Sequence, residues 1–204
     1  MARALGLLLL LVPALASADT FKLFGELHGG GMYGTGTSGD QKDSAFFAKS
    51  PHGVYGAEIG AELLFLDAWI QHHQYTDGSR LTTWTQFGLG VHTLSEMGTP
   101  EDRKAHTNGY LEFSAGVFFG MGTGQQVQPP LDNAQISDKG FLLEGRLGFG
   151  KHLSSIFDLG VEIPVSYGFF FKNGNGANAN NTSNQYRGAE GEVLLALRAN
   201  IKLF

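Results

Sequence analysis

Apolar side chains recur at every second position through most of this chain. Between Phe157 and Tyr167 the odd-numbered positions hold only apolar or aromatic residues, and the even-numbered positions hold Asp, Gly, Glu, Pro and Ser. A period of two is that of a β-strand, which sends alternate side chains to opposite faces of a sheet. The pattern predicts eight strands: Phe21–Tyr33, Val54–Phe65, Ala68–Thr76, Leu81–Thr93, Gly109–Met121, Gly140–His152, Ile156–Phe171 and Gly188–Phe204.

An even number of strands, each with one apolar and one polar face, is typical of an antiparallel barrel that crosses a membrane. The chain has no cysteine, so closure of the sheet, which leaves no unpaired strand edge, would stabilise an exported fold without disulfides. After residue 18 no run approaches the roughly 18 consecutive apolar residues of a membrane helix. The sequence therefore predicts an all-β fold, an eight-stranded antiparallel transmembrane β-barrel.

The direction of the apolar face distinguishes two kinds of barrel. A soluble, lipocalin-like periplasmic barrel has the same alternation, with its apolar face turned inward around a ligand. Here the polar face is rich in Gly, Ala and Ser, as a narrow lumen requires, so we expect the apolar face to meet lipid and keep the soluble barrel as an alternative. Aromatic residues near the predicted strand ends would form the interfacial girdles of a membrane barrel: Tyr33, Tyr55, Trp69, Tyr75, Phe169, Phe171 and Tyr186.

Charged residues of both signs occupy the polar face along the predicted strands. They are Lys22, Glu26, Glu58, Glu62, Glu112, Glu144, Arg146, Asp158, Glu162, Glu190, Glu192, Arg198 and Lys202. Because buried charges need partners, we expect the basic side chains to pair with carboxylates inside the lumen. Nine acids against four bases leave five acids in excess, which predicts carboxylates that are protonated, in contact with water near a rim, or available to a cation.

The N-terminal segment has the features of a secretory signal peptide. Arg3 gives a positive start, Leu5–Val12 is an apolar run, and Ala16–Ala18 supplies the small residues of a cleavage site. The apolar run is too short to cross about 30 Å of hydrocarbon. We therefore expect residues 1–18 to be a signal peptide and residues 19–204 to be one barrel domain.

The predicted connections differ in length and composition. Thr35–Gly53, Gly122–Lys139 and Lys172–Arg187 are long and polar, and with a periplasmic N-terminus all three would lie outside the cell. Leu94–Asn108 is a charged connection that would lie on the opposite side, and Asp77–Arg80 is a short external one. The long external loops are where contacts with other molecules are expected.

With an export signal, eight alternating strands and a C-terminal Phe204, the chain resembles the small bacterial outer-membrane β-barrels of the OmpA transmembrane domain, OmpX and OmpW type. The resemblance implies a monomer in outer-membrane lipid and lipopolysaccharide, inserted by the barrel assembly machinery, which recognises a terminal aromatic such as Phe204. The family has apolar residues two and four positions before the end, where this chain has Lys202 and Asn200. Either Phe204 faces the rim of the lumen, or a bulge shifts the register.

The same resemblance implies a structural or surface-interaction role in the cell envelope through the external loops, with a narrow, porin-like passive pore as an open possibility. No basic stripe points to nucleic acid. A lipid A-modifying barrel enzyme is the catalytic alternative, since His152 and Ser154 echo a His-x-Ser-Asn motif with Asp158 or Glu162 downstream. Ser155 stands where that motif has Asn, so we expect no enzymatic activity.

Three histidines raise the question of a metal site. His72 and His73 are adjacent, and His92 lies in the next predicted strand. Adjacent residues of a strand point to opposite faces, so His72 and His73 cannot bind one ion in regular geometry. The expectation from the sequence is no metal and no cofactor.

Overall fold

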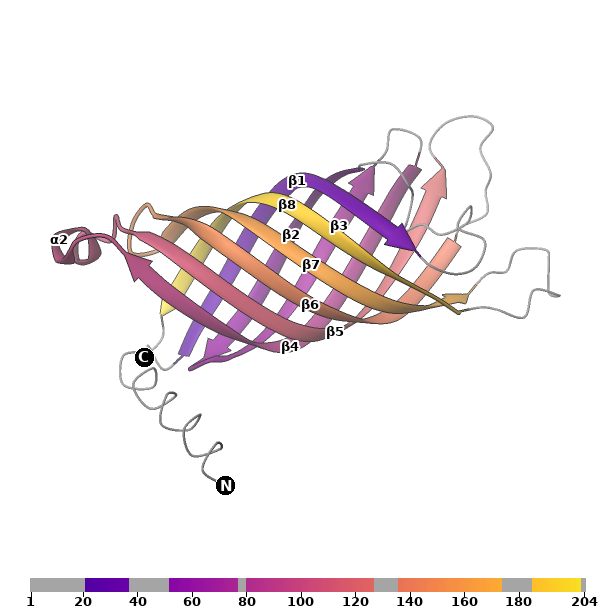
Figure 1. The fold of residues 1–204 in the computed structure, drawn as a ribbon, viewed down its shortest axis with the longest axis horizontal. Helices are drawn as coiled ribbons and strands as arrows, with labels where there is room; N and C mark the ends of the chain where they lie inside the picture. Colours follow the sequence, from indigo (N-terminus) through magenta and orange to yellow (C-terminus); the bar gives the residue numbers. More distant parts are fainter. Residues whose placement is uncertain (1–20, 37–51, 77–79, 127–135, 174–184, 203–204) are drawn as a thin grey trace, which may run out of the picture.

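Eight strands form a closed antiparallel barrel in a computed structural model, which describes residues 21–36, 52–76, 80–126, 136–173 and 185–202 (Figure 1). Each strand pairs with its neighbours in sequence, and β1 pairs with β8 to close the sheet. The strands are β1 (Phe21–Gly36), β2 (His52–Leu63), β3 (Leu66–Thr76), β4 (Arg80–Met97), β5 (Gly109–Gln126), β6 (Ile136–His152), β7 (Phe157–Asn173) and β8 (Gln185–Lys202), with a short helix α2 (Pro100–Lys104) between β4 and β5. The predicted eight-stranded antiparallel barrel is confirmed.

The outer surface of the barrel is apolar and its interior is polar. Leu27, Ile59 and Leu89 are each more than 60% exposed on the outside, whereas their neighbours along the strands, such as Glu26 and Glu58, are buried. This is the reverse of a soluble lipocalin-like barrel, whose apolar residues line the cavity, and it is the arrangement of a barrel that crosses a membrane. No helix in the described part of the chain is long and apolar enough to span a membrane.

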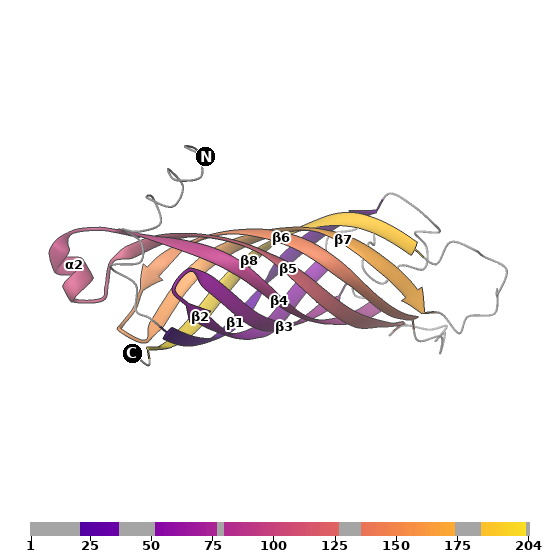
Figure 2. The ribbon, with the colours of Figure 1, turned by 90° about the horizontal axis from the view of Figure 1, so that it is seen from below.

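The connection expected at Leu94–Asn108 is shorter than predicted, because its first four residues belong to β4. β4 continues to Met97, where it pairs with Gly109 at the start of β5, so the β4–β5 hairpin extends past the neighbouring strands and carries α2 at its tip (Figures 1 and 2). The charged residues had indicated a loop, but this part of the hairpin is exposed on both faces and needs no apolar alternation.

α2 begins with a capping box. The Thr99 hydroxyl accepts a hydrogen bond from the Asp102 N–H at 3.1 Å, and the Asp102 carboxylate accepts from the Thr99 N–H at 3.1 Å and from its hydroxyl at 2.7 Å. These bonds to Thr99 hold the pKa of Asp102 below its usual value. A carboxyl group whose pKa is lowered in the folded state stabilises the folded form at pH values above the pKa that it has in the unfolded chain. That contribution is lost as the pH falls.

We therefore expect Thr99→Ala to increase amide hydrogen exchange in residues 99–107 at neutral pH, because it removes both hydrogen bonds of the Thr99 hydroxyl. The same segment of the unmodified chain should exchange faster as the pH falls below the usual pKa of an aspartic acid and Asp102 becomes protonated, once the intrinsic pH dependence of exchange is subtracted. Ser95→Ala, outside the capping box, is the matched control. Identical exchange in residues 99–107 for Thr99→Ala and the unmodified chain would contradict the role of the cap.

Two aromatic residues expected in the interfacial girdles lie inside the barrel instead. Trp69 and Tyr75 are only 5% and 3% exposed, whereas Tyr33 and Tyr55 are 58% and 49% exposed on the outside. β3 offers no clear apolar alternation, so its faces could not be read from its sequence. The lumen accommodates the Trp69 ring because facing positions are glycines: a Cβ at Gly90 would come within 2.5 Å of the ring.

Pro164 lies in β7 and points inward. It pairs in register with Arg146 of β6, while the β7–β8 pairing is interrupted between Glu162 and Val165 and resumes with the register unchanged. The missing N–H of proline accounts for a local break in the hydrogen-bond ladder. The unshifted register excludes a β-bulge at this position.

The two ends of the sequence are described only in part. The predicted signal peptide lies within residues 1–20 and the predicted assembly signal is Phe204, and both lie outside the described residues. The register between β1 and β8 is continuous from Gly36↔Gly188 to Lys22↔Lys202. No bulge therefore shifts β8 in the part that the structure describes.

Candidate functional site: a charged network in the lumen

The predicted lumen charges lie on the inner face of the barrel. All of them except Lys202, whose side chain is outside the described part, are buried or half-buried at inward-facing positions. Alternate residues of each strand point into the barrel, and the strand pairing places inward-facing residues of one strand opposite inward-facing residues of the next. They divide into a central group and two groups nearer the ends.

Arg146 on β6 is one centre of the middle group. Its guanidinium lies 2.9 Å from Glu58 Oε2, 3.0 Å from Glu144 Oε1 and 3.1 Å from Glu162 Oε2. Glu58 belongs to β2, four strands away from β6 in the eight-stranded ring, so this contact crosses the lumen. Arg146 is 5% exposed and Glu58 is 2% exposed, which makes this a buried ion pair.

Arg198 on β8 is the second centre. Its Nε lies 3.0 Å from Glu26 Oε2, and its Nη1 lies 3.0 Å from Glu112 Oε2. Its Nη2 lies 3.5 Å from Glu162 Oε1, so Glu162 links the two arginines. The guanidinium also stands 4.9 Å from the centre of the Phe24 ring, a cation–π geometry.

Two further carboxylates, Glu190 and Glu192, lie in the lumen beyond Glu144, toward the strand ends that residues 37–51 join. The Ser166 hydroxyl donates to Glu190 Oε1 at 2.8 Å, and the Tyr75 hydroxyl donates to Glu192 Oε1 at 3.1 Å. His73 Nδ1 lies 2.8 Å from the same tyrosine hydroxyl and 3.5 Å from Glu192. Among the described residues, hydroxyl and imidazole groups are therefore the partners of these buried carboxylates.

Uncharged amides extend the central group beyond Glu144. Trp84 Nε1 donates to Gln86 Oε1 at 2.8 Å, and Gln86 Nε2 donates to Gln71 Oε1 at 2.5 Å and to Glu144 Oε2 at 3.3 Å. Trp84, Gln71 and Gln86 are at most 4% exposed. The interior is therefore filled by side chains, as is usual for a barrel of eight strands.

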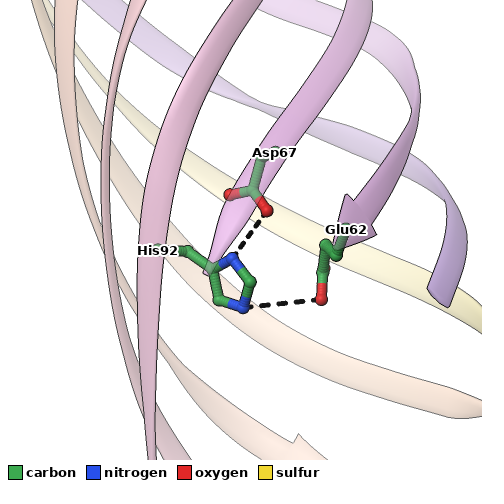
Figure 3. Close-up of side chains that lie close together, drawn as sticks. All are labelled: Glu62, Asp67 and His92. Atoms are coloured by element: carbon green, nitrogen blue, oxygen red, sulfur yellow. Dashed lines mark hydrogen bonds and ion pairs between the residues drawn. The ribbon is translucent and has the colours of Figure 1, made fainter. Parts of the chain in front are cut away.

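The opposite end, which carries the β2–β3 turn and α2, has a further cluster. Lys22 Nζ lies 2.7 Å from Glu62 Oε2. His92 Nδ1 lies 2.6 Å from Asp67 Oδ1, and its Nε2 lies 3.5 Å from Glu62 Oε2 (Figure 3). The predicted strands left Leu66 and Asp67 between them as a turn. The turn is instead at Leu64, which has a φ of 60°, and Phe65, so Asp67 is the second residue of β3 and faces inward.

The sequence reasoning therefore missed several inward polar groups. They are Asp67, Gln71, His73, Tyr75 and His92. Most of them lie on β3 or pair with it, where the apolar alternation is weakest. The opposite orientations predicted for His72 and His73 are confirmed, since His72 is exposed and His73 is buried. The register of β3 with β2 would have identified its inner face.

The residues of the enzyme alternative are only partly brought together. His152 Nδ1 lies 2.5 Å from Asp158 Oδ1, and Asn200 donates to the other Asp158 oxygen. Ser154 Oγ instead accepts hydrogen bonds from the backbone N–H groups of Ile156 and Phe157, at 3.2 and 3.0 Å, and thereby closes the β6–β7 turn. His152 Nε2, the atom that a serine nucleophile would need, is buried and has no hydrogen-bond partner in the described residues.

Comparison with known proteins adds likeness at the level of fold. No protein-family model and no curated protein sequence matches the chain. Among solved structures, Neisserial surface protein A (NspA) is 11% identical, with 90% of this chain and 97% of that chain covered and a TM-score of 0.45. The N-terminal β-barrel domain of Pseudomonas aeruginosa OprF is 12% identical, with 88% and 97% covered and a TM-score of 0.39.

The chain's own geometry is decisive for its class. The sheet is closed, has eight antiparallel strands, and carries apolar residues outside and charged residues inside. The protein is a closed eight-stranded antiparallel β-barrel with the apolar exterior and charged interior of a transmembrane barrel.

Proposed function

We propose that this protein is a non-catalytic outer-membrane barrel that anchors surface segments, with a structural or surface-interaction role. The ion pairs that cross the lumen carry this proposal. Arg146 connects β6 to Glu58 on β2, and Arg198 connects β8 to Glu112 on β5. Side chains fixed across the centre favour a rigid support over a wide transport channel.

The topology supports the anchoring role. Residues 37–51, 77–79, 127–135 and 174–184 join strands at one end of the barrel, because consecutive strands are antiparallel. The other end has the two-residue β2–β3 turn, the short β6–β7 turn and the β4–β5 connection that carries α2. Outer-membrane barrels have short periplasmic turns and longer external connections, so we assign the end with residues 37–51, 127–135 and 174–184 to the cell surface.

Further parts of the proposal follow from the family resemblance. The barrel would act as a monomer in outer-membrane lipid and lipopolysaccharide, and the barrel assembly machinery would insert it, with Phe204 as the assembly signal. A narrow passive pore is the weaker candidate, because conduction would require the pairs of Arg146 and Arg198 to separate. Single-barrel conductance in planar bilayers would favour the pore over the rigid anchor.

Cell fractionation tests the location. The full chain should be found in the outer-membrane fraction and should migrate differently on gels with and without heating, because a folded barrel resists detergent at room temperature. A chain lacking residues 1–18 should remain in the cytoplasm, which also tests the signal peptide. Recovery of the full chain as freely soluble periplasmic protein would contradict the proposed location.

A further inference from the structure

Three side chains with metal-binding groups meet at the end of the lumen near the β2–β3 turn. Glu62 lies near the end of β2 and Asp67 near the start of β3, and the two are cross-strand partners beside the turn. His92 on β4 is held beside them because its backbone N–H donates to the Phe65 carbonyl of the turn at 3.1 Å. One possible ligand atom from each residue lies within 4.8 Å of the others (Figure 3).

The orientation of the His92 ring leaves one nitrogen for a metal ion. An ionised Asp67 carboxylate can only accept a hydrogen bond, so the contact of 2.6 Å places the proton on Nδ1. Nε2, the other ring nitrogen, points toward Glu62 Oε2 at 3.5 Å. A carboxylate that orients a histidine through one nitrogen while the other binds the metal is a common arrangement in zinc sites.

The separation of the two direct donors suits zinc. Zn²⁺ binds histidine nitrogen and carboxylate oxygen at about 2.0–2.2 Å in tetrahedral geometry, so two such ligands stand roughly 3.3–3.5 Å apart. The distance between His92 Nε2 and Glu62 Oε2 is 3.5 Å. Ca²⁺ prefers six to eight oxygen ligands, so an imidazole nitrogen as one of the two protein ligands favours Zn²⁺.

The surroundings leave space for the remaining ligands. A cavity of about 10 Å³, lined in part by Glu62, Asp67 and Glu112, adjoins the cluster, which is about the room needed for one water molecule. The His92 side chain is 13% exposed, so the site is accessible from this end of the lumen. Lys22 holds Glu62 at 2.7 Å with a side chain that is 20% exposed, and it would have to move aside for an ion.

We propose that His92 Nε2 and the Glu62 carboxylate bind one Zn²⁺ ion, with Asp67 positioning the imidazole and water completing the coordination. Because the ligands come from β2 and β4, and Asp67 from β3, the ion fastens three consecutive strands at the turn end. Lys22 is a built-in competitor for Glu62. Removing the charge of Lys22 should therefore strengthen metal binding at this site. A purely structural ion-pair cluster would not respond in this way.

The test uses the full chain purified from membranes in detergent, without a histidine tag and after treatment with EDTA. Isothermal titration with ZnCl₂ at pH 7.5 is expected to give one equivalent of binding. The affinity for Zn²⁺ should fall by at least about tenfold in His92→Ala and Glu62→Gln. It should rise by about tenfold in Lys22→Gln, because Glu62 then has no lysine to compete with the ion; a factor of ten in affinity is about 1.4 kcal/mol. Co²⁺ should give the visible absorption of a tetrahedral site.

The matched control is His72→Ala, because His72 lies on the outer face of β3 with its Nδ1 against the Thr85 hydroxyl at 2.7 Å. It should bind Zn²⁺ as the unmodified chain does. Heat-dependent gel migration shows that each variant is folded. Absence of stoichiometric Zn²⁺ binding to the folded unmodified chain would overturn the proposal, and so would unchanged binding in folded His92→Ala.

Discussion

Arg146→Ala is expected to lower the free energy of unfolding by about 3–5 kcal/mol, the usual cost of removing one partner from a buried ion pair. Glu58 would lose both of its hydrogen bonds to the guanidinium, at 2.9 and 3.4 Å, and it would remain almost fully buried. Urea unfolding in phospholipid vesicles can measure the change. The two tryptophans, Trp69 and Trp84, both lie in the lumen and report on unfolding of the interior.

Two comparisons separate charge from lost packing. The double variant Arg146→Ala with Glu58→Gln should recover part of the loss, because the amide carries no stranded charge. Arg103→Ala changes an exposed arginine on α2 and should alter stability by less than about 0.5 kcal/mol. Equal stability of Arg146→Ala and Arg103→Ala would refute a lumen held together by ion pairs.

Leu143→Arg is expected to destabilise the barrel in lipid by about 2–4 kcal/mol, as for a basic residue near the middle of a membrane strand. Leu143 is 54% exposed and lies near the middle of β6, on the outer face, where it pairs with Val117 of β5. In water the same substitution would place a charge on the surface at almost no cost. Urea unfolding in vesicles therefore tests directly whether this face meets hydrocarbon.

The depth of the substituted residue supplies the control. Leu153 lies in the β6–β7 turn and is 51% exposed, about as much as Leu143. Leu153→Arg should cost only about 0–1 kcal/mol, because charges near the interface reach water. Equal effects at the two positions would mean that the apolar belt is not immersed in a bilayer.

The sequence was sufficient for the strand count, the closure and the two faces of seven strands. Where a polar face alternates with an apolar one, as in β7 and β8, the period alone determines which residues enter the lumen. β3 was ambiguous because Trp69 and Tyr75 are large, apolar in part and directed inward, while His72 is polar and directed outward. On such a strand hydrophobicity does not report orientation, and only pairing with β2 assigns the face.

The sequence did not predict which charged side chains contact one another inside the lumen. Alternation predicts that Arg146 and Glu58 are both inside, but their contact spans 88 positions along the chain and depends on which strands stand opposite in the closed ring. The same holds for the cluster of Glu62, Asp67 and His92. Asp67 was assigned to a turn, and shifting that turn by two residues turns it into a lumen side chain.

The unshifted register has a consequence for how this barrel can change during evolution. Each strand pair keeps one register along its described length, including β7–β8 on both sides of Pro164. Loss or gain of one residue within a strand would exchange inside and outside for everything beyond it, and would present the glutamates to lipid. Length changes inside strands must therefore come in twos, whereas the surface connections are free to change by any number.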